Sequence, residues 1–355
     1  GLYNCLDLSG SVYDTTKHSW LQARAVWMFS TLYSEVEQNP EWLRIARSGL
    51  DFLKYHAKRD DNRLYFSLTE EGAPIYLQRK IFSECFYTIA LAQYAKATGE
   101  SAYEKEAAEM FEAVWKLAYA PGKSGRPIMD GDDVAQTLAV PMILLNVIEE
   151  LCGDDYEPYR DRIEMCLKNV DLHLINGKIY ENISKSGDQK STAVVRLMNP
   201  GHAIEAGWFL QHWALRLKDD DLKQRSAQII RSSFAHGWDE KYGGLFYFLD
   251  AEGQTPTQLE WDMKLWWPHT EAMYSFLLNY ATFGEQDDWQ NFIKVKEYAF
   301  DHFSDPEHGE WFGYLNRRGE VTHQFKGGPY KGCFHVPRAL YYCWKLLSKL
   351  EKRID

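Results

Sequence analysis

Hydrophobic residues recur along most of the chain with the spacing of helices. Ile81, Cys85 and Ile89 come four residues apart and so fall on one face of a helix. Near the C-terminus, Leu340 and Leu347 repeat this helical spacing. Strands do not alternate with helices in the manner of βαβ units, which disfavours a parallel sheet. The pattern therefore predicts an all-α protein.

A short polar and aromatic motif interrupts the helical pattern at residues 60–72, 239–253 and 305–319. Each copy contains a tight turn, a short aromatic run and a second turn that ends in glycine, which predicts a small β-hairpin. Helix pairs joined through such hairpins are typical of a closed ring of helical hairpins. We therefore predict an (α/α)6 barrel with short β-hairpins at one rim.

The same repeat bears on domain organisation. No low-complexity linker divides the chain, so we expect a single domain over residues 1–355. The first ten residues resemble a degenerate copy of the hairpin. A complete barrel would then need one more helix before residue 1, and we expect that helix to be missing from this sequence.

Composition and charge limit the classes of function. Of the 355 residues, 45% are hydrophobic and 26% are charged, which is typical of a globular protein with a sizeable core. The net charge of −11 argues against nucleic acid or an anionic membrane as partner. No apolar run approaches the roughly 20 residues of a membrane helix. The six cysteines are scattered, which indicates reduced thiols in a cytoplasmic protein and argues against a structural zinc site.

Several familiar catalytic motifs are missing from the sequence. We find no GxGxxG after a strand, no GxxxxGK[ST], no HExxH and no GxSxG. Hydride transfer, P-loop phosphoryl transfer, zinc proteolysis and serine hydrolysis therefore lose their usual sequence support. Acid–base chemistry by histidines and carboxylates remains.

The first candidate segment is residues 199–208. Asn199-Pro200-Gly201 reads as a turn that starts a helix, so His202 lies in the first helical turn with Glu205 on the same face. A helix N-terminus disfavours the imidazolium form and a nearby carboxylate favours it, and this balance suits a general base. Alternatively, His202 and Glu205 only cap the helix.

The second candidate segment is residues 260–271. Pro268 suits the first turn of a helix, which places Trp266 and Trp267 just before it and Glu271 in the first turn. Tryptophans beside ionisable groups suit the wall of a cleft. A buried carboxylate with a purely structural partner is the other reading of Glu271.

The third candidate segment is residues 326–338. Its three glycines would let the backbone approach a ligand closely, and His335 starts another helix with Arg338 one turn on. Because His202 and His335 both lie where a loop enters a helix, we expect them to face a common pocket. Arg24 stands among apolar neighbours, and a buried arginine needs a partner such as a carboxylate or a sugar oxygen.

Six segments of the chain carry a resemblance to one enzyme family: Trp20 to Met28, Arg79 to Thr88, Asn199 to Phe209, Gly243 to Phe248, Pro256 to Glu271 and Lys326 to Arg338. In this order, and over nearly the whole chain, they resemble the N-acylglucosamine 2-epimerases. The ending Gly-Cys-Phe-His-Val-Pro-Arg at residues 332–338 is similar to the N-acylglucosamine branch rather than to the related cellobiose epimerases and mannose isomerases.

The resemblance implies an (α/α)6 barrel, usually a homodimer, that interconverts N-acetyl-D-glucosamine and N-acetyl-D-mannosamine in sialic acid and amino sugar metabolism. It implies that His202 and His335 are the catalytic histidines. Arg24 and Glu271 match the family's important arginine and glutamate, and Glu205 fits a carboxylate that supports a histidine. We also predict seven substrate-binding residues: Asn199, Glu84, Tyr87, Lys264, Trp267, His269 and Arg338.

The family's chemistry needs no cofactor or metal ion. ATP or another nucleotide activates several members, but without a P-loop we cannot place such a site in this sequence. In the implied mechanism the sugar opens to its aldehyde, one histidine removes the C2 proton and the other returns a proton to the opposite face. Arg24 would stabilise the enolate oxygen, while Glu271 and Glu205 would orient the histidines.

Three other functions stay open at this point. The chain could be another free-sugar epimerase or isomerase, acting on mannose or cellobiose. It could be a glycoside hydrolase that uses Glu205 and Glu271 as its carboxylate pair. It could also be a non-catalytic interaction protein.

Overall fold

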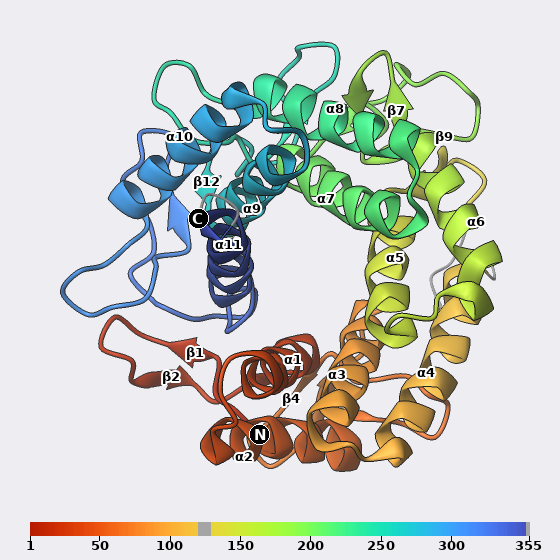
Figure 1. Cartoon of the computed structure of the whole chain (residues 1–355), viewed down its shortest axis with the longest axis vertical. Helices are drawn as coiled ribbons and strands as arrows, with labels where there is room; N and C mark the ends of the chain where they lie inside the picture. The colour runs from red at the N-terminus through yellow and green to blue at the C-terminus, as the bar shows by residue number, and fades with distance from the viewer. Residues whose placement is uncertain (120–128, 353–355) are drawn as a thin grey trace. The chain divides into compact units, whose positions relative to one another are not determined.

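The computed structural model describes residues 1–119 and 129–352 (Figure 1). The chain divides into two compact units, each described here by itself. Unit 1 comprises Gly1–Asp132, Asn146–Ile163 and Phe325–Phe334; unit 2 comprises Asp133–Leu145, Glu164–Gln324 and His335–Asp355. The single domain expected from the sequence stays a prediction.

Four helices form the centre of unit 1. They are α1 (Ser19–Glu35), α2 (Pro40–Phe52), α3 (Phe82–Thr98) and α4 (Ser101–Tyr119). Helix α2 continues into a π-helical turn, Leu53–Ala57. Helix α1 packs on α2 and α3, and α3 packs on α4. Short strands accompany them: β1 (Cys5–Leu6) pairs with β2 (Val12–Asp14), and β4 (Ser67–Leu68) lies between β3 (Lys17–His18) and β5 (Pro74–Tyr76).

Five helices form the centre of unit 2. They are α7 (Pro200–Leu217), α8 (Asp220–Gly237), α9 (Trp266–Phe283), α10 (Gln286–His302) and α11 (His335–Glu351). Helix α9 lies beside both α7 and α11 (Figure 1), while α8 packs on α7 and α10 packs on α9. Helices α7 and α9 are buried along most of their length, whereas α8 and α10 bury a single stripe. A helix with apolar residues all round is buried, and one with apolar residues on a single face buries that face alone.

Two further helices, α5 (Ala139–Cys152) and α6 (Arg160–Asp171), carry the chain between the units, with a 3-10 turn at Glu157–Tyr159 before α6. Short strand pairs complete unit 2. They are β6 (Val134–Thr137) with β9 (Asn182–Ser184), β7 (Leu174–Ile175) with β8 (Lys178–Ile179), β10 (Leu197–Met198) with β11 (Leu249–Asp250), and β12 (Lys264–Leu265) with β13 (Tyr314–Leu315).

The repeated motif of the sequence has a consistent structure. Its first turn follows a helix and is closed by an isolated bridge in each copy: Lys58–Leu64, Trp238–Leu245 and Ser304–Trp311. The short strand at or just after the end of the aromatic run then pairs with the strand that immediately precedes a different helix: β4 with β3 before α1, β11 with β10 before α7, and β13 with β12 before α9. The predicted hairpins are therefore also the devices that hold the N-terminal ends of α1, α7 and α9.

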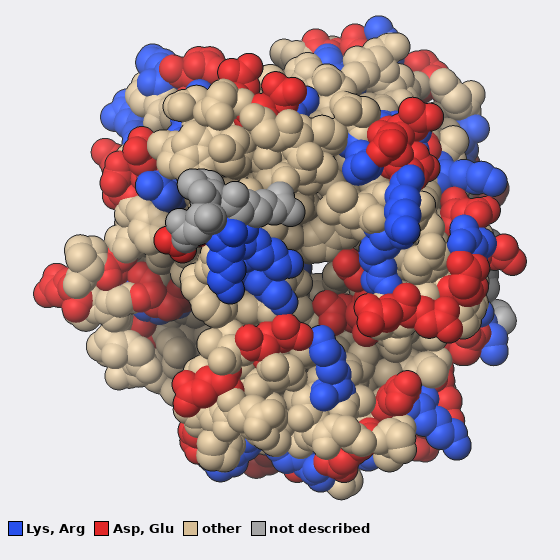
Figure 2. Space-filling model, in the orientation of Figure 1, with Lys and Arg blue, Asp and Glu red and all other residues tan. Residues whose placement is uncertain are grey.

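Among the described residues, no helix is both long enough and apolar enough to cross a membrane. Lysine and arginine side chains are intermixed with aspartate and glutamate over the face drawn in Figure 2.

Candidate active site

The N-terminal turns of α7 and α11 and the first two turns of α9 meet in unit 2 and bring both predicted histidines together. His202 lies in the first turn of α7, where Asn199 caps the helix by accepting a hydrogen bond from the His202 backbone N–H at 3.1 Å. His335 is the first residue of α11, and Glu271 lies in α9. Side chains that are far apart along the sequence are thus neighbours through helix packing.

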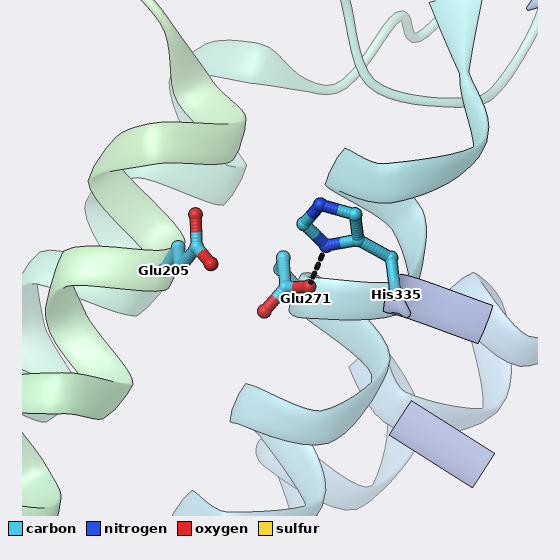
Figure 3. Close-up of side chains that lie close together, drawn as sticks. All are labelled: Glu205, Glu271 and His335. Carbon is cyan, nitrogen blue, oxygen red and sulfur yellow. Dashed lines mark hydrogen bonds and ion pairs between the residues drawn. The ribbon is translucent and has the colours of Figure 1, made fainter. Parts of the chain in front are cut away.

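His335 is held by a buried carboxylate. Its Nδ1 lies 2.7 Å from Oε1 of Glu271 (Figure 3). A carboxylate oxygen accepts this hydrogen bond, so Nδ1 carries the hydrogen and Nε2 is the ring nitrogen that can take up a proton. Glu271 is itself fixed by two more donors, Trp208 Nε1 at 2.9 Å and Arg338 Nη2 at 2.6 Å.

His202 has its own carboxylate partner, Glu181. Both carboxylate oxygens of Glu181 lie 3.1 Å from Nδ1 of His202, so Nδ1 carries the hydrogen here too and Nε2 is the ring nitrogen that can take up a proton. Glu181 directly precedes β9, and its backbone N–H donates to Leu197 O while its carbonyl accepts from Leu138 N. Two strand-like hydrogen bonds therefore hold the backbone of this glutamate beside the start of α7.

Glu181 was not among the site residues predicted from the sequence. A signal was present, because Glu181 immediately follows Asn176–Tyr180, a degenerate copy of the repeated hairpin motif. In the other copies, the strand that follows the motif's turn pairs with the strand before α1, α7 or α9. Each of these helices carries a candidate site residue.

Trp267 lies against both histidines. The centre of its indole is 5.1 Å from the His202 ring and 5.9 Å from the His335 ring, and both imidazoles are inclined to it by 41°. Gly201 makes this position possible, since a Cβ there would fall 2.7 Å from Trp267 Cη2. The two imidazoles thus contact the same indole.

Glu205 and Arg338 form a buried ion pair between α7 and α11. Arg338 Nη2 donates to Glu205 Oε1 at 3.0 Å. Burial alone would lower the pKa of Arg338, but the charges of Glu271 and Glu205 raise it above its ordinary value. Arg338 is therefore a fixed cation between two carboxylates. The sequence paired Glu205 with His202; the structure shows it accepting from Arg338.

Lys264 and His269 tie the start of α9 to the turn that follows α8. The ammonium of Lys264 donates to Asp239 Oδ2 and Gly244 O, each at 3.2 Å, and burial lowers its pKa to about 8. His269 accepts from Leu245 N at 2.9 Å, and burial lowers its pKa to about 3. Their substrate-binding role, like that of Asn199, stays a prediction beside these structural contacts.

Three predicted residues belong to unit 1. Glu84 accepts from Arg63 Nε at 2.7 Å, and Tyr87 donates from its hydroxyl to Glu106 Oε1 at 2.9 Å. Burial and then the Glu106 charge raise the pKa of Tyr87. The substrate-binding role of Glu84 and Tyr87 stays a prediction.

Arg24, the third of these residues, has an aromatic environment. Its guanidinium carbon lies 4.1 Å from the Phe86 ring, 4.5 Å from Trp20 and 4.9 Å from Phe334. Three π faces favour a cation at this position, and the planar guanidinium stacks well on them. The sequence predicted a carboxylate or a sugar oxygen as the partner of Arg24, and these rings were not predicted.

Similarity to known proteins extends over the whole chain. The model of the family described as N-acylglucosamine 2-epimerase (GlcNAc 2-epimerase) matches residues 1–339. The N-acylglucosamine 2-epimerase of Bos taurus is 44% identical over 366 residues, covering 100% of this chain and 86% of the relative. The N-acylglucosamine 2-epimerase of Homo sapiens is 43% identical, covering 99% and 85%.

Solved structures of other sugar enzymes share the fold. A D-mannose isomerase superposes with a TM-score of 0.83 at 18% identity, covering 97% of this chain and 92% of the other. A sugar epimerase from a ruminal bacterium gives a TM-score of 0.82 at 20% identity, covering 98% and 92%. These likenesses confirm the predicted fold class, the (α/α)6 barrel.

Proposed function

Because the chain belongs to the N-acylglucosamine 2-epimerase family, we propose that it interconverts N-acetyl-D-glucosamine and N-acetyl-D-mannosamine. The 43–44% identity to curated N-acylglucosamine 2-epimerases over the full chain supports this substrate pair. One observation carries the chemistry: His202 and His335 flank the indole of Trp267, and each has a carboxylate at Nδ1.

The proposed reaction moves a proton at C2 of the open-chain sugar. The aldehyde at C1 makes the C2–H bond acidic, and the Nε2 atom of one histidine takes that proton as the C2–H bond breaks. The electron pair passes to the carbonyl oxygen and forms an enolate. The other histidine, protonated at Nε2, then delivers its proton to the opposite face of C2. Exchange with water restores both imidazoles for the next turnover.

Three charged side chains would serve the two histidines and the enolate. Glu181 and Glu271 hold Nδ1–H of His202 and His335 and keep each Nε2 directed to the reaction. We propose that Arg24 stabilises the enolate oxygen as negative charge develops on it. The acetamido group at C2 disfavours a ketose product, so reprotonation at C2 gives the epimer.

We further propose that the protein is a cytoplasmic homodimer that acts in amino sugar and sialic acid metabolism. ATP or another nucleotide is proposed as an activator, while the chemistry itself needs no cofactor. The resemblance to the family supports the dimer and the nucleotide, and the scattered reduced cysteines support the cytoplasm.

The glycoside hydrolase alternative loses support at Arg338. Hydrolysis needs one carboxyl group to act as an acid and the other to act as a base or nucleophile. Glu205 and Glu271 both accept a hydrogen bond from the guanidinium of Arg338, so both carboxyl groups are paired with the same fixed cation. Neither carboxyl group is then suited to deliver a proton.

Proton NMR in deuterated water tests the proposed function. The purified protein is incubated with N-acetyl-D-mannosamine, with and without ATP. We expect N-acetyl-D-glucosamine with deuterium at C2, and a faster rate with ATP. A parallel incubation contains mannose in place of the N-acetylated sugar. If a ketose accumulates there while N-acetyl-D-mannosamine stays unchanged, the protein is instead a sugar isomerase.

A further inference from the structure

Three side chains of the kinds that bind metal ions converge in the candidate active site. Among the described residues, Glu205, Glu271 and His335 form the only group of three whose donor atoms could hold a metal ion, with those atoms all within 4.8 Å of one another (Figure 3). Two carboxylates and an imidazole suit zinc and related divalent ions, which take nitrogen and oxygen ligands. All three side chains are buried.

The same three side chains surround the guanidinium of Arg338. Its Nη2 lies 2.6 Å from Glu271 Oε1, 3.0 Å from Glu205 Oε1 and 3.4 Å from His335 Nδ1. The arginine is 3% exposed, and its guanidinium lies 5.2 Å from the ring of Trp208. A cation supplied by the chain itself therefore lies among ligands that would suit a metal ion.

We propose that Arg338 is a positioning residue whose guanidinium takes the place of a divalent metal ion among Glu205, Glu271 and His335. Its single positive charge offsets one of the two negative charges of the buried carboxylates, and its hydrogen bond fixes Glu271 at the angle that orients His335. A buried carboxylate without a partner is costly, so the cluster needs a cation at this point. The inference rests on the proposed role of His335, and it makes Arg338 a residue that does not itself contact the sugar.

This arrangement predicts a gain of metal binding when the arginine is removed. Arg338→Ala leaves two carboxylates and an imidazole around a space without a cation. We expect this variant to bind one Co²⁺ per chain, with the visible absorption bands of a four- or five-coordinate site and a Kd in the micromolar range or tighter. Spectroscopic titration with cobalt chloride, followed by competition with Zn²⁺, measures this directly.

Three variants serve as controls for the titration. Arg338→Lys keeps a cation and is expected to bind no Co²⁺. Arg231→Ala also removes a guanidinium from a buried carboxylate, that of Asp288, but among the described residues no histidine and second carboxylate converge there. The double variant Arg338→Ala, His335→Ala is expected to lose the cobalt spectrum, which ties the bound ion to these ligands.

Kinetics separate positioning from substrate binding. We expect kcat of Arg338→Ala to fall by about 100-fold, the size of effect typical when a group that orients a catalytic residue is lost. KM is expected to change by less than about twofold, because Arg338 contacts the carboxylates and not the sugar. Arg338→Lys is expected to recover part of kcat. A raised KM with unchanged kcat would overturn the proposal and return Arg338 to substrate binding.

The proposed function and the proposal about Arg338 can be refuted independently of each other. Absence of epimerase activity in the wild-type protein would refute the proposed function while leaving the cobalt result readable. A folded Arg338→Ala protein that binds no more Co²⁺ than wild type would refute the proposal about Arg338. If Arg338→Ala does not fold, Arg338→Ser places a small polar side chain there, leaves room for an ion, and allows the same titration.

Discussion

The two histidines have the same kind of partner but different surroundings. The side chains of His335 and Glu271 are 9% and 2% exposed, and Glu271 also binds Trp208 and Arg338. The side chains of His202 and Glu181 are 30% and 12% exposed, and Glu181 is held through the backbone hydrogen bonds of a short strand. One histidine is thus fixed in a buried polar cluster, and the other is oriented by a carboxylate near the surface of the site.

The difference shows that orientation and stability are coupled at one histidine and separable at the other. Each hydrogen bond in a buried cluster is strengthened by low dielectric, and each broken one leaves an unpaired polar group. At the more exposed pair, water can replace a lost partner. Substitutions at the two carboxylates therefore distinguish the two environments.

The largest effect is expected at Glu271. Glu271→Gln removes the charge that fixes Nδ1–H of His335 and leaves Arg338 with one carboxylate fewer. We expect kcat to fall by about 10³- to 10⁴-fold, as when a catalytic histidine loses the carboxylate that sets its tautomer. Breaking the buried pair is also expected to cost about 3–5 kcal/mol of unfolding free energy. Steady-state kinetics and urea unfolding measure the two effects, and a loss of kcat without loss of stability would contradict a coupled cluster.

A smaller effect is expected at Glu181. Glu181→Gln keeps the shape of the side chain but not its charge, and we expect kcat to fall by about 10- to 100-fold. Because the pair with His202 is partly exposed, unfolding free energy is expected to change by no more than about 1 kcal/mol. A stability loss as large as that of Glu271→Gln would show that the two environments are alike.

Gly201 tests the indole that the two histidines share. A Cβ at this position would lie 2.7 Å from Trp267 Cη2 and 2.9 Å from Pro268 Cβ, so Gly201→Ala must displace the start of α9 or the indole. We expect kcat to fall by about tenfold and unfolding free energy to fall by about 1–3 kcal/mol. Gly131→Ala is the matched control, because a Cβ there meets no atom within 4 Å. Equal activity of the two variants would mean that the position of the Trp267 indole does not affect catalysis.

His269 sharpens the comparison as a histidine held for structure. Burial lowers its pKa from 6.5 to about 3, so the folded state keeps it neutral while the unfolded chain takes up a proton below pH 6.5. Unfolding free energy is therefore fully retained above pH 6.5 and falls as the pH drops toward 3, by about 1.4 kcal/mol per pH unit from this group. Between pH 6.5 and about pH 5 the expected loss is about 2 kcal/mol.

His269→Gln isolates that contribution, because glutamine can donate and accept hydrogen bonds but does not titrate. Urea unfolding at about pH 7 and about pH 5 is the measurement. We expect the wild-type protein to lose more unfolding free energy than the variant over this interval. Equal losses would mean that His269 is protonated in the folded state.

The sequence predicted the parts of this structure that depend on local pattern. Helical spacing identified the all-α class, and the turn and aromatic motifs identified the hairpins that hold the helix starts. His202 and His335 stood out because a Pro-containing turn or a glycine-rich loop precedes each helix. These signals lie close in the sequence to the side chain they concern.

The contacts that fix the site depend on packing between distant segments. Glu181 reaches His202 from 21 residues away, and Arg338 reaches Glu205 across 133 residues. Spacing along one helix suggested the pair His202 with Glu205, but the neighbouring helix supplied the stronger partner for that carboxylate. The rings around Arg24 likewise come from three separate segments. A local pattern can mark one of these residues, as at Glu181, but the pairing itself depends on the packing that brings separate segments together.

Proton exchange in single-histidine variants tests the central claim most directly. His202→Asn and His335→Asn are each incubated in deuterated water, once with N-acetyl-D-mannosamine and once with N-acetyl-D-glucosamine. NMR then follows both epimer formation and deuterium at C2 of the recovered sugar. If each histidine serves one face, we expect both variants to lose epimer formation by about 10²- to 10⁴-fold. The remaining exchange is expected to favour one epimer in His202→Asn and the other in His335→Asn. Near-normal turnover in either variant, or the same epimer preference in both, would contradict the two-histidine mechanism.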